Sequence, residues 1–218
     1  LGERRLAALL DDYGEATVDA SFDAFSARAE ALMREAVAAL PDGGAVVVWW
    51  SQDQDGDDGG IFGQRFSRNV AQGLLDPDGL EFPVNTFTDE DQVEPRVTSW
   101  GSGFLATWTS ENKQRNNGDG DRATGEDGDG AGVFARAFGI DGVPSVDPFR
   151  VNVTTANHQY GGVPLALSGD RIVVAWSSTT DGEDYFDGLE NPDNYDEVFL
   201  RLVEEITQGP GPGPGPVS

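Results

Sequence analysis

An apolar, β-branched segment with a tryptophan near its end recurs three times along the chain. The copies are 45–51, 104–110 and 172–178, with their tryptophans at Trp49, Trp108 and Trp176. After an acidic loop, each copy is followed by a second segment rich in apolar residues, at 61–66, 133–138 and 198–203. Aromatic and β-branched residues with a period of two favour strands over helices. Because the same strand pattern occurs three times, the sequence predicts a mainly β fold made of repeated units.

The first two copies share a further pattern, Phe-x-Val-Asn, which ends at Asn85 and at Asn152. A glutamine follows seven residues later in each case, at Gln92 and Gln159. We interpret these amides as partners for backbone groups where strands end. With the apolar segment that precedes each tryptophan strand, a unit holds four short antiparallel strands, as a propeller blade does. We therefore expect a β-propeller-like array of three four-stranded units, at about 35–94, 95–163 and 164–207, the last of which lacks the Phe-x-Val-Asn strand.

The two ends of the chain do not follow the repeat. Apolar residues fall at helical spacing near the N-terminus and predict a helical segment over 1–34. A strand at 16–22 that replaces the missing fourth strand of the last unit is the alternative. Residues 208–218 consist largely of alternating Gly and Pro and predict a semi-extended linker. Since three blades are fewer than propellers normally use, the array is open, is completed by a second chain, or continues in further blades.

The charge balance limits the partners of this chain. Asp and Glu number 39 against 14 Lys and Arg, which gives a net charge of -25. A surface of that sign repels phosphate backbones and anionic membranes, so we expect no nucleic acid partner. No apolar run approaches the roughly 20 residues that cross a bilayer, so we expect no membrane insertion. Because the chain has no cysteine, any metal site must use oxygen ligands.

Acidic residues gather in the interval between the two apolar strands of every unit. In the first unit, aspartates alternate with other residues around a glycine, a spacing that turns carboxylates toward one centre and suits Ca²⁺. The candidate ligands are Asp53, Asp55, Asp57, Asn117, Asp119, Asp121, Asp127, Asp129, Asp181, Asp184 and Asp187. The alternative is that these loops are solvated turns of a protein from a high-salt habitat, which attract cations only diffusely.

These units resemble the tandem repeats of very large secreted bacterial surface proteins and haemolysin-type calcium-binding proteins. The shared pattern runs Asp-Gly-Gly, a Val-rich strand ending in Trp, Asp-x-Asp-Gly, Gln-Arg-Phe, Phe-x-Val-Asn-Thr and Gln. The match is closest over 41–97, weaker over 101–167 and partial over 170–203. The resemblance implies a propeller-like fold, an adhesive or matrix role, and an extracellular or cell-surface location. It specifies no ligand.

The tryptophans allow two interpretations. The repeated ones, at the ends of apolar strands, are expected to be core anchors. Trp50 and Trp100 break the repeat and are candidates for an exposed patch that stacks on sugars. Arg65, Arg136 and Arg201 are expected to pair with the acidic loops on the outer face.

No motif of a known catalytic centre is present. His158 is the only histidine, no Gly-x-Ser-x-Gly elbow accompanies it, and no phosphate-binding fingerprint appears. We therefore expect a non-enzymatic structural or adhesive module, whose partners are other protein chains, further repeats of the same parent or surface glycans. The alternatives are a carbohydrate-binding or glycoside-hydrolysing propeller, and an accessory subunit that docks through its N-terminal helices.

Overall fold

The computed structural model describes residues 35–56, 59–111, 126–128, 130–168, 171–178 and 197–203. The chain divides into two compact units, Leu1–Arg34 and Glu35–Ser218, and the described residues all belong to the second. The helical segment expected over 1–34 and the linker expected over 208–218 lie outside the described residues. Within that described part, the structure contains no helix able to cross a bilayer.

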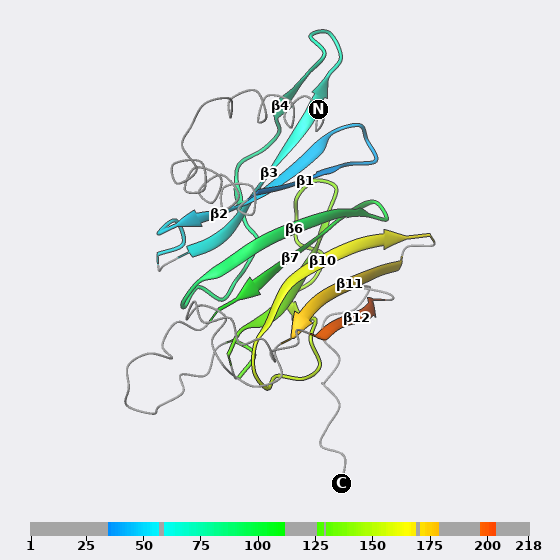
Figure 1. Cartoon of the computed structure of the whole chain (residues 1–218). Helices are drawn as coiled ribbons and strands as arrows, with labels where there is room; N and C mark the ends of the chain where they lie inside the picture. Colours follow the sequence, from blue (N-terminus) through cyan, green and yellow to red (C-terminus); the bar gives the residue numbers. More distant parts are fainter. Residues whose placement is uncertain are drawn as a thin grey trace, which may run out of the picture. The chain divides into compact units, whose positions relative to one another are not determined.

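The described residues form three antiparallel sheets (Figure 1). The first contains β1 (Glu35–Ala39), β2 (Ala45–Gln52), β3 (Gly59–Asn69), β4 (Leu74–Pro77) and β5 (Phe82–Pro83). The second contains β6 (Gln92–Trp100), β7 (Gly103–Ser110), β8 (Gly132–Gly139) and β9 (Phe149–Arg150). The third contains β10 (Gln159–Leu167), β11 (Arg171–Ser178) and β12 (Glu197–Val203). The mainly β architecture expected from the repeat is confirmed.

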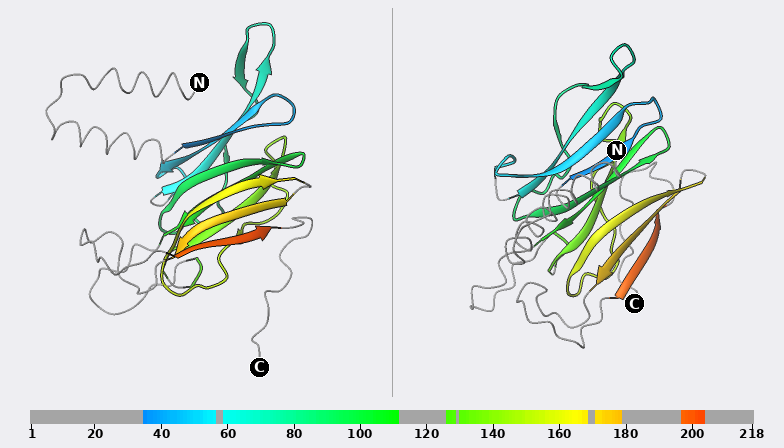
Figure 2. Two further views of the ribbon diagram at one scale, coloured as in Figure 1. Left: turned by 45° about the vertical axis from the view of Figure 1, so that its right-hand side comes forward. Right: turned by 45° about the horizontal axis from the view of Figure 1, so that its top comes forward.

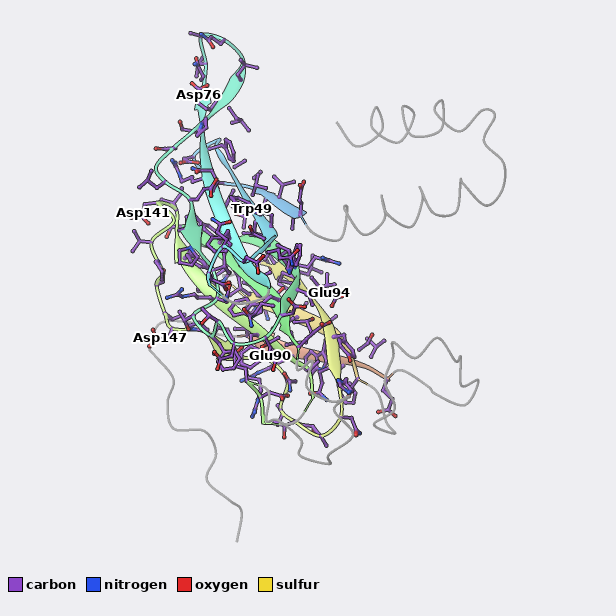
Figure 3. All side chains as sticks on the ribbon, turned by 90° about the vertical axis from the view of Figure 1, so that its left-hand side faces the viewer. Trp49, Asp76, Glu90, Glu94, Asp141 and Asp147 are labelled. Carbon is purple, nitrogen blue, oxygen red and sulfur yellow. The ribbon has the colours of Figure 1, made fainter. Side chains whose placement is uncertain are left out.

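The strand count of the first sheet differs from the expected four. β3 continues past the point where β8 ends and pairs through Phe66–Asn69 with β4, which forms a hairpin that projects from the sheet. Figure 3 labels Asp76 on this hairpin. The expectation missed β4 because its residues Leu74–Pro77 are all exposed, and in the second unit only a single bridge, Phe138 with Pro144, occupies the equivalent place. The first sheet therefore has five strands.

The register of the two central strands is the same in all three sheets. Trp49 lies opposite Phe62, Trp108 opposite Phe134 and Trp176 opposite Phe199. The rings of the second and third pairs are stacked, with centroids 6.3 Å and 5.8 Å apart. Residues directly opposite in an antiparallel pair share one face of the sheet. Each pair thus marks the same face of its own sheet.

Two apolar clusters join the three sheets, which lie side by side (Figure 2). The first cluster joins the first and second sheets, with Val46 and Val48 of β2 against Phe104 and Trp108 of β7. The second cluster contains Leu105 and three residues of β8, packed against Ile172, Val174 and Trp176 of β11. Alternate residues of β7 thus face opposite neighbours, and the whole strand is buried. The second sheet is the core of the described part.

The burial of the tryptophans corrects two expectations. Trp108 and Trp176 are buried against the preceding sheet, as expected of core anchors. Trp49 occupies the corresponding face of the first sheet, is only half-buried and belongs to neither cluster. Trp50 and Trp100 do not form an exposed patch, because each packs against one of the clusters. Neighbouring strand residues point to opposite faces, so Trp50 faces the first cluster while Trp49 points to the other face of its sheet.

Candidate functional site

An asparagine organises the end of the first sheet. Asn85 Oδ1 accepts a hydrogen bond from the Ile61 amide at 2.7 Å. Its Nδ2 donates to the carbonyl of Phe87 at 2.8 Å and to Gln92 Oε1 at 2.9 Å. A longer contact of 3.3 Å joins Nδ2 to Asp55 Oδ2. The side chain is almost fully buried and all of its hydrogen-bonding atoms are engaged.

The second sheet repeats this arrangement contact by contact. Asn152 Oδ1 accepts from the Val133 amide at 2.9 Å. Its Nδ2 donates to the Thr154 carbonyl at 2.8 Å, to Gln159 Oε1 at 2.9 Å and to Asp127 Oδ2 at 3.2 Å. We call each such group of Asn, Gln and Asp a clasp. The prediction that these amides satisfy backbone groups at strand ends is confirmed.

Glycines let the aspartates approach the clasps. A Cβ added to Gly60 would collide with the carboxylate of Asp55, and one added to Gly132 would meet Asp127 at 2.7 Å. A side chain at either position would displace the aspartate side chain from its place beside the strand. The glycine, the Asp, the Asn and the Gln therefore form one structural motif.

The residues expected to bind calcium are placed only in part. Asp53 is exposed and has a φ of 59°, whereas Asp55 and Asp127 belong to the clasps. Within the described ranges, no three His, Cys, Asp or Glu side chains form a group that could hold a metal ion. The remaining candidates lie outside the described residues: Asp57, Asn117, Asp119, Asp121, Asp129, Asp181, Asp184 and Asp187.

Two of the three arginines join neighbouring sheets, a role that the sequence did not indicate. Arg136 Nη1 donates to the carbonyl of Val84 at 3.1 Å, from the second sheet to the first. Arg201 Nη1 makes the equivalent bond to Val151 at 2.8 Å, from the third sheet to the second. The acidic loops with which these two were expected to pair lie mostly outside the described residues. By strand register their counterpart in the first sheet is Gln64, and Arg65 instead pairs with Asp42 and Asp78.

A bulge on each of β6 and β10 provides a second connection between sheets. Glu94 has a φ of 53° and Gly161 a φ of 67°, and each lies at the register shift of its strand. Glu94 Oε2 accepts from the Gly161 amide and from Thr109 Oγ1, both at 2.9 Å. Figure 3 labels Glu94. The Gly161-Gly162 pair was the signal for a bulge in the sequence.

A pocket of about 460 Å³ lies where the third sheet meets the loop of the second unit that begins at Asn152 and continues to Asn157. Its lining includes Trp176, Phe199, Arg201, Asn157, Ser178 and Glu197. Thr154, which also lines it, accepts the same clasp bond as Phe87 does in the first unit.

Two ionisable side chains near the second clasp are shielded from solvent, Glu126 half-buried and His158 buried. Burial raises the pKa of Glu126 to about 7, the Ser110 hydroxyl opposes this shift, and the Asp127 carboxylate adds to it. His158 is 4% exposed, its Nδ1 accepts from the Ala131 amide at 3.1 Å, and its ring stacks on Tyr160. His158 therefore has a structural role in the second unit.

Comparison with known proteins gives partial matches. The family model described as Hydantoinase B/oxoprolinase matches residues 1–73, about a third of the 218-residue chain. A solved structure, the endo-arabinase from Bacteroides thetaiotaomicron VPI-5482, is similar at 10% identity and a TM-score of 0.39. That likeness covers 79% of this chain, which spans 56% of the arabinase chain. No curated protein matches the sequence. The proposals below therefore start from the residues of this chain.

Proposed function

We propose that this chain is a non-enzymatic structural or adhesive module, a propeller-like array of stacked β units within a larger secreted or cell-surface assembly. The observation that supports it most is the outer face of the third sheet, which turns apolar residues to solvent in three cross-strand rows. The rows are Leu165–Val173–Leu202, Val163–Ala175–Leu200 and Ser177–Val198. The resemblance to repeats of large secreted surface proteins suggests the location.

The exposure of this face contrasts with the same positions one unit earlier. Val198, Leu200 and Leu202 are 72%, 69% and 45% exposed. Their counterparts on β8 are Val133, Ala135 and Ala137, all of which are fully buried against the third sheet. A contiguous exposed apolar surface marks an interaction site. A further β unit, on another chain or in the same parent, is the partner that such a face fits.

The assignment of repeated residues supports a non-enzymatic role. The clasps and the arginine bridges use the repeated polar side chains to hold strands and sheets together. Because these side chains are engaged in structural hydrogen bonds, we do not assign them to acid–base or nucleophilic chemistry. A screen for glycoside hydrolysis tests this part of the proposal, and turnover of any glycan would contradict it.

Sedimentation velocity tests the stacking face. We expect the chain to associate as its concentration rises, and more strongly at high salt, because salt screens the net charge of -25. Leu200→Asp should return the protein to a monomer. Val70→Asp is the matched control, since Val70 is 76% exposed but lies in the hairpin away from this face. A parent chain that stays monomeric at every concentration and salt would contradict the stacking role.

Calcium uptake by the acidic loops is part of the proposal. Asp55 Oδ1 is buried and accepts no hydrogen bond from the described residues, so it retains lone pairs for a cation. We expect chelation to lower the melting temperature and Mg²⁺ to restore it poorly, because Mg²⁺ prefers small octahedral sites. Asp55→Asn should lower the response to chelation. An identical melting curve with and without chelator would remove specific calcium binding.

Carbohydrate binding in the pocket is a second candidate function. The pocket combines the stacked Trp176–Phe199 pair with polar groups on Asn157, Ser178 and Glu197, a mixture that suits the apolar and hydroxyl surfaces of a sugar. A glycan array tests it, with Phe199→Ala as the variant that should lose any signal. A signal that survives this change would place sugar binding elsewhere.

A further inference from the structure

Among the described strands, none pairs with the edge of β12 that corresponds to the paired edges of β3 and β8. β3 pairs with β5, so that Phe62 lies opposite Pro83. β8 pairs with β9, so that Phe134 lies opposite Arg150. β12 pairs with β11 on one side, and none of the strands in the described part pairs with its other edge.

The hydrogen bonds at this edge are the same in the first two sheets. In the first, the Val84 amide donates to the Ile61 carbonyl at 2.8 Å, and Asn85 Oδ1 accepts from the Ile61 amide. In the second, Val151 donates to the Val133 carbonyl at 2.7 Å, and Asn152 accepts from the Val133 amide. One strand residue thus receives both a backbone donor and a side-chain acceptor. By register, the corresponding residue of β12 is Val198.

The aromatic residue next to this position is more exposed on β12 than on β3 or β8. Phe62 and Phe134 are 7% and 5% exposed, whereas Phe199 is 40% exposed. The pocket of about 460 Å³ lies along the same edge, since Glu197, Phe199, Leu200 and Arg201 all line it. The pocket therefore lies along an edge of β12 whose backbone groups have no strand partner among the described residues.

The 218 residues contain the Phe-x-Val-Asn pattern twice, at 82–85 and 149–152, and both copies already serve the first two sheets. None of the described strands is a third copy of this pattern, and the pattern does not occur a third time in the 218 residues. We infer that the free edge of β12 binds an extended Phe-x-Val-Asn strand supplied by a second polypeptide. An added strand gains affinity from backbone hydrogen bonds and specificity from side-chain pockets. The inference rests on the repeated edge geometry and does not require an adhesive role.

A synthetic peptide with the sequence of residues 147–160 is the probe, added in trans to the full chain. We expect saturable binding, with slower hydrogen exchange at the Val198 amide. The peptide with Val151→Pro loses the donor to the Val198 carbonyl. It should bind about tenfold more weakly, the effect of about one backbone hydrogen bond.

Cross-linking fixes the register, because the chain has no cysteine of its own. The pairing of Ala135 with Phe149 in the second sheet places Leu200 opposite the same peptide position. A peptide with Phe149→Cys should form a disulfide with the Leu200→Cys protein and not with the Leu202→Cys protein. Both cysteines replace exposed residues, so folding is preserved in either case.

Three results would overturn the inference. The first is the absence of saturable binding, and the second is equal binding of the two peptides. The third is a Leu200→Cys protein that cross-links to its own copy in preference to the peptide, which would assign this strand to self-association. Because the peptide assay does not depend on association of the chain, its failure is distinguishable from failure of the stacking face.

Discussion

Arg136 in the second sheet donates a hydrogen bond from Nη1 to the carbonyl oxygen of Val84 in the first, at a distance of 3.1 Å. Its guanidinium also lies 5.5 Å from the ring centroid of Phe138. The equivalent bond from Arg201 to Val151 crosses the next boundary. A single donor–acceptor pair therefore recurs at each boundary, which makes it the most direct sign that one packing mode is used twice.

Arg136→Met should destabilise the chain by roughly 1–3 kcal/mol, because the Val84 carbonyl would remain buried without its charged donor. Arg68→Met is the matched control, since Arg68 is exposed on the first sheet and its loss should cost less than about 0.5 kcal/mol. Urea denaturation of both variants measures the difference. Equal midpoints for the two variants would show that the bridge contributes nothing.

Asn152→Asp keeps the shape of the second clasp and removes its two amide hydrogens. The new carboxylate would face Asp127 Oδ2 and Gln159 Oε1 in a buried position, so we expect a loss of roughly 3–5 kcal/mol. Asn69→Asp places a carboxylate near Asp76 in the exposed hairpin and should cost less than about 1 kcal/mol. Thermal unfolding at neutral pH gives both values. A mild effect at both positions would argue against a structural clasp.

The local parts of the fold were predictable from the sequence. The tryptophan strands follow a period of two, and the offset of seven residues between Asn85 and Gln92 is repeated at Asn152 and Gln159. These features involve residues that lie near one another in the sequence of one unit, so they can be recognised from the sequence alone. The interpretation of these amides as partners for backbone groups was correct for that reason, whereas the contact of each Asn with Asp55 or Asp127 was not foreseen.

The parts that depend on contacts between units were not predictable. The sequence suggested one shared role for Arg65, Arg136 and Arg201, but strand register places Gln64, not Arg65, at the position of Arg136. Likewise, Trp49 shares its phase with Trp108 but lacks a sheet in the described part that would bury it. Burial of a strand residue depends on what faces it, and the repeat pattern carries no information about that neighbour.

Glu126 makes stability depend on pH. Its pKa is raised to about 7, so protons bind more tightly to the folded state than to the unfolded one. Its contribution is fully present below the unfolded pKa near 4.5 and is lost as pH rises through 7. Glu126→Gln should therefore be more stable than the parent at pH 8, by on the order of 3 kcal/mol, and similar to it at pH 4. Melting temperatures of both proteins across this range test the effect, and a Gln variant that is less stable at pH 8 would refute it.

Glu94 holds the bulges of the second and third sheets together. Glu94→Ala leaves the Gly161 amide without its carboxylate acceptor and should cost roughly 1–2 kcal/mol. Glu94→Gln retains an oxygen acceptor and should recover most of this loss. Glu81→Ala is the control, since Glu81 is exposed and accepts one long bond from Gln54. Chemical denaturation separates the three variants, and identical stability for Ala and Gln at position 94 would exclude the bridge.

Hydrogen exchange measured strand by strand tests the central claim most directly, that three copies of one unit stack so that, among the described sheets, only the middle one has a neighbouring sheet on both faces. β7 and β8 lie between both apolar clusters and should exchange most slowly, whereas β12, an edge strand of the third sheet within the described part, should exchange faster than its counterparts β3 and β8. Protection in β12 equal to that in β7, or faster exchange in β7 than in β2 and β11, would contradict the stacked-repeat account.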